Sequence, residues 1–216
     1  KSGSLGLAHN GNLVNADAVR DDLAGLGHAF TSAGDTEVIA HDLARNLLEA
    51  DLVRAVKATM ERIHGSYSLT IMHDETVLGL RDPQGNRPLC LGAVEDGYVL
   101  ASESAAIDAL GGDLIRDVRP GELVVLRPHG SDYDSYRLVD QDTTAHCFFE
   151  HVYFSRPDSV IDRHLVYDVR LALARLLWAD YGCHRAVGMP VPHPARALAP
   201  GTREPAPEGG PQREPP

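Results

Sequence analysis

Leu5-Gly-Leu-Ala-His-Asn-Gly-Asn-Leu-Val-Asn15 is the stretch on which the expected architecture depends. Residues 5–8 form a short apolar run, which predicts a buried strand. Residues 9–12 contain the turn dipeptide Asn-Gly, which predicts that this strand runs into a turn. Asn15 is a suitable N-cap for a helix over residues 16–26, where apolar side chains recur at helical spacing. The segment therefore predicts a strand, a turn and a helix in succession.

Two more helices and then a group of strands are expected further along the chain. Asp35 and Glu37 favour a helix start, and apolar spacing continues that helix to about residue 48. A third helix is expected over residues 52–63 and ends at Gly65. The pattern then changes to short β-rich segments over residues 67–72, 76–80, 98–101 and 123–126. Grouped helices and grouped strands predict a layered α+β fold rather than alternating βαβ units.

The C-terminal third divides into a helix and a tail. Residues 162–181 have an apolar stripe at helical spacing, which predicts an amphipathic helix. Residues 183–216 hold 9 of the 14 prolines and few large apolar side chains. Such a composition buries too little apolar surface to offset the entropy of ordering, so a disordered tail is expected.

The charge of the chain is negative and unevenly distributed. Its formal net charge is −11, and residues 1–150 hold 24 acidic against 12 basic side chains, whereas residues 151–216 hold 7 against 8. This surface would repel phosphate backbones, so a nucleic-acid partner is not expected. Arginine outnumbers lysine 18 to 2, and together with the acid excess this resembles the composition of proteins from salt-adapted organisms.

No segment indicates a membrane span or an export signal, because no apolar run reaches the length of about eighteen residues that a span requires. The three cysteines, Cys90, Cys147 and Cys183, show neither Cys-x-x-Cys spacing nor a disulfide pattern. The histidines show no metal-binding spacing. A cytoplasmic protein whose residues hold no metal is therefore expected.

Four segments carry a resemblance to a known family. They are Leu7-Ala-His-Asn-Gly-Asn-Leu-Val-Asn15, Gly34-Asp-Thr-Glu37, Arg81-Asp-Pro-Gln-Gly-Asn-Arg-Pro-Leu89 and Phe149-Glu-His-Val-Tyr-Phe-Ser-Arg-Pro-Asp-Ser159. In this order they resemble the amidophosphoribosyltransferases, and the fourth marks the passage from glutaminase to phosphoribosyltransferase domain in that family. The resemblance covers residues 3 to about 181 and implies an N-terminal-nucleophile αββα sandwich.

The resemblance implies roles for three residues. Asn10 and Gly11 match the pair whose side-chain amide and backbone N–H stabilise the oxyanion formed from glutamine. Asp35 matches the carboxylate that binds the α-ammonium group of glutamine. Alternatives remain open at both places, because Asn-Gly is a common turn dipeptide and Asp at a helix start is a common N-cap.

Other motif residues are expected to be structural. For Arg81, Asp82, Arg87 and the Ser102-Glu103 pair, turn geometry and buried ion pairing are the preferred interpretations. Cys147 lies where some relatives place one ligand of an iron–sulfur cluster. A single thiolate cannot hold such a cluster, so Cys147 is interpreted as a small buried residue and no cofactor is expected here.

The chain departs from the family pattern at its beginning. Family members attack glutamine with an N-terminal Cys thiolate, but position 1 is Lys1, and no cysteine of the chain lies in the Cys-Gly-Ile/Val context of that nucleophile. The first strands of the sandwich would also precede Ser4. We therefore expect an incomplete sandwich that is inactive alone.

The expected domains are a partial glutaminase domain over residues 1–150, a linker with the first helix of a phosphoribosyltransferase domain over 151–182, and a degenerate tail over 183–216. A complete member would use glutamine, phosphoribosyl pyrophosphate and Mg²⁺ to make 5-phosphoribosylamine, as a homo-oligomer. A non-catalytic glutamine-binding or scaffold module is the alternative. A third interpretation, another class II glutaminase, is disfavoured by the fourth motif.

Overall fold

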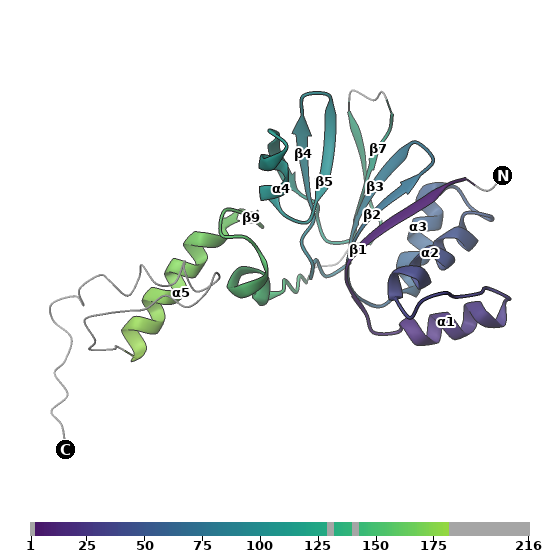
Figure 1. Ribbon diagram of the computed structural model, residues 1–216, viewed down its shortest axis with the longest axis horizontal. Coiled ribbons are helices and arrows are strands. Elements are labelled where there is room, and N and C mark those ends of the chain that lie inside the picture. The colour runs from purple at the N-terminus through teal and green to yellow at the C-terminus, as the bar shows by residue number, and fades with distance from the viewer. Residues whose placement is uncertain (1–2, 129–131, 140–142, 182–216) are drawn as a thin grey trace, which may run out of the picture. The chain divides into compact units, whose positions relative to one another are not determined.

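The computed structural model describes residues 3–128, 132–139 and 143–181. The chain forms two compact units, Lys1–Cys147 and Phe148–Pro216, and Figure 1 shows the elements of each. No helix among the described residues is both long and apolar enough to cross a lipid bilayer. The predicted disordered tail over residues 183–216 lies outside the described residues.

A five-stranded antiparallel sheet forms the centre of the first unit. Its strand order is β1-β2-β3-β7-β8, with bounds β1 Leu5–Leu13, β2 Gly65–His73, β3 Thr76–Arg81, β7 Glu122–Leu126 and β8 Tyr133–Arg137. In the β1–β2 ladder Asn10 lies opposite Ser68, and Gly11 lies opposite Tyr67. Because β1 pairs only with β2, β1 is an edge strand of the described sheet.

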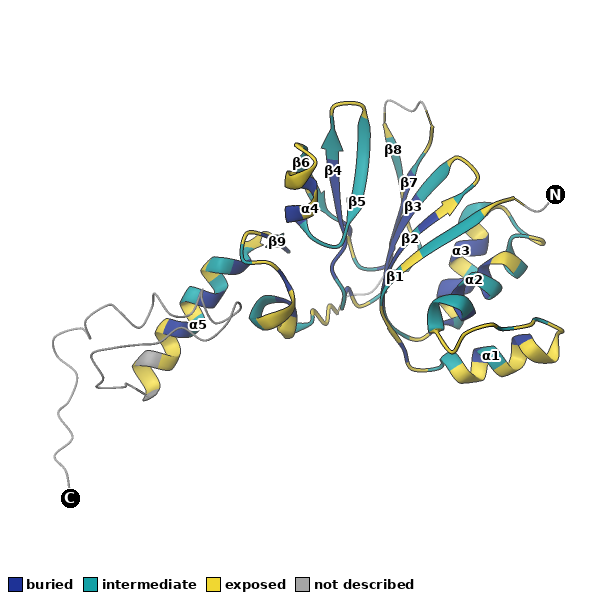
Figure 2. Cartoon of the chain, viewed as in Figure 1, coloured by how far each residue is buried: buried dark blue, intermediate teal, exposed yellow. Residues whose placement is uncertain are grey.

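Helices α2 Asp35–Asn46 and α3 Leu52–Arg62 cover one face of this sheet, and α1 Ala16–Gly25 packs against α2. The helix faces turned toward the strands are buried (Figure 2). Between these layers lies an apolar core that includes Ile39, Leu43, Val56, Met60, Leu69, Ile71, Leu78 and Leu80. Burying each such side chain contributes about 1.5–3 kcal/mol, so this core holds the helices on the sheet.

A second, three-stranded sheet packs on the opposite face. Its order is β5-β4-β6, with bounds β4 Cys90–Val94, β5 Gly97–Ala101 and β6 Asp113–Asp117, and α4 Ser104–Ala109 covers its outer side. The two sheets approach closely where a Cβ atom on Gly79 would lie 2.7 Å from the Leu100 side chain. The layers are therefore helices, sheet, sheet and helix, which confirms the predicted α+β sandwich.

The second unit contains a π-helix, η1 Glu150–Phe154, a hairpin of β9 Val160–Ile161 and β10 His164–Leu165, and helix α5 Val166–Tyr181. The buried Arg170 of α5 donates hydrogen bonds to the carbonyl oxygens of His151 and Ser155, at 2.7 Å each. The helix predicted from residue 162 begins at Val166, because Asp162 and Arg163 adopt positive φ angles of 48° and 69° at the hairpin turn.

Other sequence predictions also need correction. The turn predicted over residues 9–12 is wrong, since β1 continues to Leu13 and its ladder with β2 includes Asn10 and Gly11. Helix α2 ends at Asn46 rather than near residue 48. The elements not predicted from the sequence are α4, η1 and the short strands β4, β6, β8, β9 and β10.

Candidate functional site

Asn10 is held from two sides by residues distant in the sequence. Its amide oxygen Oδ1 accepts hydrogen bonds from Nε and Nη2 of Arg87, at 3.1 and 2.7 Å. Its amide nitrogen Nδ2 donates to Oγ of Ser102, at 3.1 Å. These contacts join β1 to the segment after β3 and to the end of β5, so the amide has a defined orientation before any ligand binds.

Gly11 is a position that the fold itself restricts to glycine. Its φ angle is 152°, and a Cβ atom there would lie 2.0 Å from the carbonyl oxygen of Ser66. A separation below 3.0 Å is essentially never found for a real Cβ atom. A side chain at this point would force β1 away from β2.

Asp35 begins helix α2 and contacts β1. Its Oδ2 accepts a hydrogen bond from the backbone N–H of Leu13, at 2.9 Å, and its Oδ1 lies 3.6 Å from Nδ1 of His9. Gly34 occupies the N-cap position and Asp35 does not cap the helix through its side chain, so the alternative interpretation of Asp35 as an N-cap is wrong. The carboxylate instead ties α2 to the end of β1.

His9 lies buried beside Asp35, with 2% of its side chain exposed. Burial lowers its pKa below the usual value, although the Asp35 carboxylate acts in the opposite direction. Its Nδ1 lies 3.4 Å from Oγ1 of Thr36, whereas its Nε2 has no hydrogen-bond partner among the described residues. Burial thus disfavours the protonated form of the imidazole that packs against Asp35, the carboxylate to which the family resemblance gives a substrate-binding role.

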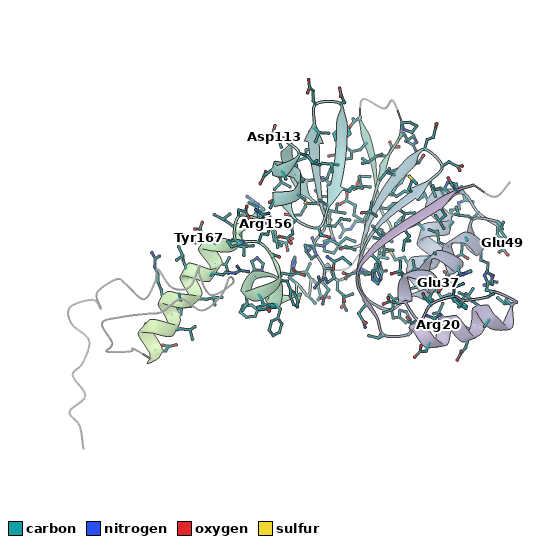
Figure 3. The ribbon with its side chains drawn as sticks, in the orientation of Figure 1. Arg20, Glu37, Glu49, Asp113, Arg156 and Tyr167 are labelled. Atoms are coloured by element: carbon teal, nitrogen blue, oxygen red, sulfur yellow. The ribbon has the colours of Figure 1, made fainter. Side chains whose placement is uncertain are left out.

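The loop that leads into Asp35 is fixed by side chains of α1 and α2. Glu37 accepts hydrogen bonds from the backbone N–H and the hydroxyl of both Thr31 and Ser32, at 2.7–2.9 Å. These bonds, that from the Thr31 backbone first, lower the pKa of Glu37 to about 2. Arg20 donates to the carbonyl oxygens of Ser32 and Gly34, and Figure 3 labels both Arg20 and Glu37. Asp35 is thus presented from an ordered loop.

Asn10 and Asp35 lie near the same end of β1 but on opposite faces. Successive side chains of a strand alternate between faces. His9, beside Asp35, therefore faces the helices, whereas Asn10 faces the second sheet. A cavity of about 870 Å³ lies elsewhere, and it is lined by residues that include Leu5, Leu47 and His73 but none of Asn10, Gly11 or Asp35. Asn10 on β1 and Asp35, which contacts β1, are thus linked through this strand and form no hydrogen bond with each other.

The cysteines of the first unit differ in environment. Burial raises the pKa of Cys90 to about 12, and its thiol donates to the carbonyl oxygen of Ala101. Cys147 is half-buried, and its backbone N–H donates to the carbonyl oxygen of Asn86. Within the described residues no three His, Cys, Asp or Glu side chains are grouped to hold a metal ion.

A family model described as a glutamine amidotransferase domain matches residues 1–109, which is half of the chain. The chain belongs to the glutamine amidotransferase family. This confirms the resemblance predicted from the sequence motifs. The matched residues include every part of the site described above except Cys147.

Relatives of this glutamine amidotransferase extend the similarity beyond that domain. The amidophosphoribosyltransferase of Archaeoglobus fulgidus is 43% identical over 178 residues, covering 82% of this chain and 38% of that protein. That of Methanocaldococcus jannaschii is 38% identical over 216 residues, covering 94% and 46%. The chain spans less than half the length of these curated relatives. Their names confirm that the family is enzymatic.

A solved structure shows the same fold. The glutamine phosphoribosylpyrophosphate amidotransferase from B. subtilis, complexed with ADP and GMP, superposes with a TM-score of 0.83 at 36% identity. The match covers 93% of this chain and 44% of that chain. The agreement supports the sandwich architecture of this glutamine amidotransferase and the elements of its second unit.

Sequence reasoning missed three contacts of this glutamine amidotransferase site. Arg87 and Ser102 had been given structural roles, yet both bond directly to Asn10. His9 had been considered only as a metal ligand, yet it lies beside Asp35. These residues belong to the sequence motifs, but Arg87 and Ser102 lie 77 and 92 residues from Asn10 along the chain. Nothing in the local sequence predicts a contact over such separations.

Proposed function

We propose that the chain is the glutamine-handling part of an amidophosphoribosyltransferase. The complete enzyme would release ammonia from glutamine and transfer it to phosphoribosyl pyrophosphate, giving 5-phosphoribosylamine in the first step of purine synthesis. The proposal rests above all on the side-chain amide of Asn10, which hydrogen bonds from Arg87 and to Ser102 hold in place. Asn10 lies beside Gly11 on β1, and Asp35 contacts the same strand. The names of the relatives support the rest of the reaction.

The proposed roles follow from the chemistry of amide hydrolysis. Asp35 binds the α-ammonium group of glutamine, since a carboxylate forms strong charge-assisted hydrogen bonds with a cation. Asn10 and Gly11 donate hydrogen bonds to the oxygen that becomes negative during attack on the side-chain amide.

A polypeptide limited to these 216 residues is proposed to bind glutamine without hydrolysing it. Lys1 offers no thiolate, and the buried Cys90 has a raised pKa, which makes it a poor nucleophile. Phosphoribosyl pyrophosphate, Mg²⁺ and homo-oligomer formation belong to the proposed complete enzyme. Cys147 is proposed to hold no iron–sulfur cluster, and the location is proposed to be cytoplasmic because Cys90 and Cys147 are free thiols.

Titration with L-glutamine, followed by two-dimensional NMR, tests the proposal. Saturable shifts at residues around Asn10 and Asp35 are expected. Asp35→Asn should weaken binding by about 10- to 100-fold, since a hydrogen bond to a charged group contributes about 1.5–3 kcal/mol. Asp51→Asn is the matched control, because Asp51 also stands at a helix start but caps its own helix through Arg54. Equal affinity in the Asp35→Asn variant would contradict the proposal.

A glutaminase assay tests the second part. We expect no ammonia from the wild-type polypeptide above the level of the Asn10→Ala variant. Ammonia release that disappears in both the Asn10→Ala and Asp35→Asn variants would show that a nucleophile is present among these residues. That result would overturn the proposed lack of hydrolysis while leaving the family unchanged.

A further inference from the structure

An asparagine amide is useful for stabilising an oxyanion in only one of its two orientations. Oδ1 accepts hydrogen bonds and Nδ2 donates them, and the two groups have nearly the same shape. A rotation of 180° about the last side-chain bond of Asn10 would present an oxygen, and not an N–H, to the negative oxygen of the substrate. Some contact within the protein must therefore decide which orientation is populated.

We propose that Arg87 is a positioning residue that holds Asn10 in its donating orientation. The inference rests on the function proposed above for Asn10. A guanidinium group has only donors. Arg87 directs two of them, Nε and Nη2, at Oδ1 of Asn10, at 3.1 and 2.7 Å. In the rotated state the amide NH₂ group would face these donors, and both charge-assisted hydrogen bonds would be lost.

Ser102 cannot make this choice alone. Its hydroxyl lies 3.1 Å from Nδ2 of Asn10, but a hydroxyl both donates and accepts, so it could bond to either end of the amide. Arg87 therefore carries the discrimination and Ser102 completes the contact. Of the two hydrogens on Nδ2, one is directed to Ser102, and the second has no partner within the described part of the chain. That second hydrogen is the one proposed to meet the oxyanion.

The segment that carries Arg87 is rigidly built. The backbone N–H of Arg87 donates to the buried carboxylate of Asp82, at 3.2 Å. The carbonyl oxygen of Arg87 accepts from Nε of Arg81 and from Oγ of Ser68, at 2.8 and 3.1 Å. Asp82 also accepts from the backbone N–H groups of Gln84 and Asn86.

Through this network the Arg-Asp-Pro-Gln-Gly-Asn-Arg segment, residues 81–87, contributes to the proposed reaction by fixing the position of Asn10. Arg81 and Asp82 hold the backbone of Arg87, and Arg87 holds Asn10. Donors fixed before the substrate arrives need no reorganisation as charge develops, which is the condition for effective electrostatic stabilisation. The structural roles expected for Arg81 and Asp82 therefore extend to the oxyanion through two further side chains, those of Arg87 and Asn10.

The orientation can be measured by NMR on the wild-type chain. The side-chain NH₂ resonances of Asn10 are identified by their disappearance in the Asn10→Ala variant. We expect nuclear Overhauser cross-peaks from these protons to the β-protons of Ser102. A dominant cross-peak between the NH₂ protons and the Nε proton of Arg87 would show the rotated orientation and overturn the proposal, whatever the behaviour of any variant.

Variants test whether Arg87 causes that orientation. In Arg87→Met, which keeps length but has no donor, the NH₂ resonances should broaden or shift and lose their response to glutamine. In Arg87→Lys, which restores a cationic donor, the resonances should return toward the wild-type positions. Arg54→Met is the matched control, since Arg54 is 83% exposed and lies away from Asn10 on α3. Unchanged Asn10 resonances in a folded Arg87→Met variant would overturn the proposal.

The two proposals fail in different ways. If glutamine binds in an Asp35-dependent manner but Arg87→Met leaves the Asn10 amide unchanged, the positioning role is wrong and the proposed function stands. If glutamine does not bind at all, the proposed function fails, while the orientation of Asn10 without ligand still reports on Arg87. Should Arg87→Met not fold, the cross-peaks of the wild-type chain decide the question.

Discussion

Replacing Gly11 with alanine should destabilise the protein severely, because the added methyl group meets backbone atoms that cannot rotate away. The Cβ atom would lie 2.0 Å from the carbonyl oxygen of Ser66 and 2.8 Å from Cα of Tyr67, where ordinary contacts begin at 3.4 Å. Relief requires β1 and β2 to separate by about 1 Å, which would break ladder hydrogen bonds. Overpacking costs about 1–3 kcal/mol and backbone strain a similar amount, giving about 2–6 kcal/mol in total.

Urea unfolding followed by circular dichroism measures this loss. With a slope of about 2 kcal/mol per molar urea, the midpoint should fall by about 1–3 M. Gly97→Ala is the matched control, because Gly97 has nearly the same φ angle, 157°, but an added methyl group there would meet no atom of the described residues within 4 Å. It isolates backbone strain from the contact with Ser66. Equal midpoints for the two variants would refute the steric argument.

Three further variants test the energetics around the site. His9→Gln should flatten the dependence of unfolding free energy on pH. Burial lowers the folded-state pKa of His9, so its contribution to the unfolding free energy is complete above the unfolded-state pKa and is lost as pH falls below about 6.5. Urea unfolding at several pH values measures this dependence, and His64→Gln, at an exposed position, is the control. The same pH dependence in His9→Gln and in the wild type would contradict the prediction. Arg81→Met should lower the unfolding free energy by at least about 2 kcal/mol. The buried carbonyl oxygens of Gly85 and Val118 lose their donor, at about 1–3 kcal/mol each, whereas that of Arg87 keeps its hydrogen bond from Oγ of Ser68. A loss equal to that of Arg54→Met would contradict this. Glu122→Gln should remove a loss of stability at acidic pH. Burial alone would raise the pKa of Glu122, but hydrogen bonds, chiefly from Arg116, outweigh burial and lower the pKa. The resulting stabilisation is therefore present above the unfolded-state pKa and is lost as pH falls through the folded-state pKa. If urea unfolding shows the same loss of stability at acidic pH in Glu122→Gln as in the wild type, the prediction is wrong.

The sequence predicted those elements whose periodicity is strong. Helices α1 and α3 were found close to their observed bounds, and β2, β3, β5 and β7 were recognised as strands. Strands β6 and β8 were missed because Asp113–Asp117 and Tyr133–Arg137 are rich in charged and polar residues. Their place in the sheets is set by partner strands, and such tertiary context is not encoded in local propensity.

The prediction at Asn10-Gly11 failed for a related reason. Asn-Gly favours a turn when considered alone, but the ladder with Ser68 and Tyr67 holds both residues in β1. The sequence named Asn10 and Asp35 as site candidates, and these roles stay predictions. Asp35 begins α2 and contacts β1 on the face opposite to Asn10. The contacts with Arg87 and His9 could not be predicted, because they depend on how distant segments pack.

The closeness of the two sheets constrains how this protein can change through evolution. Leu100 fills the space directly above Gly79, so that a methyl group at position 79 would lie 2.7 Å from it. A larger residue at position 79 is therefore acceptable only after position 100 becomes smaller, which makes the order of the two substitutions matter. We expect the residue sizes at positions 79 and 100 to change together during evolution, with one becoming larger as the other becomes smaller. An intermediate with large residues at both positions would be removed by selection.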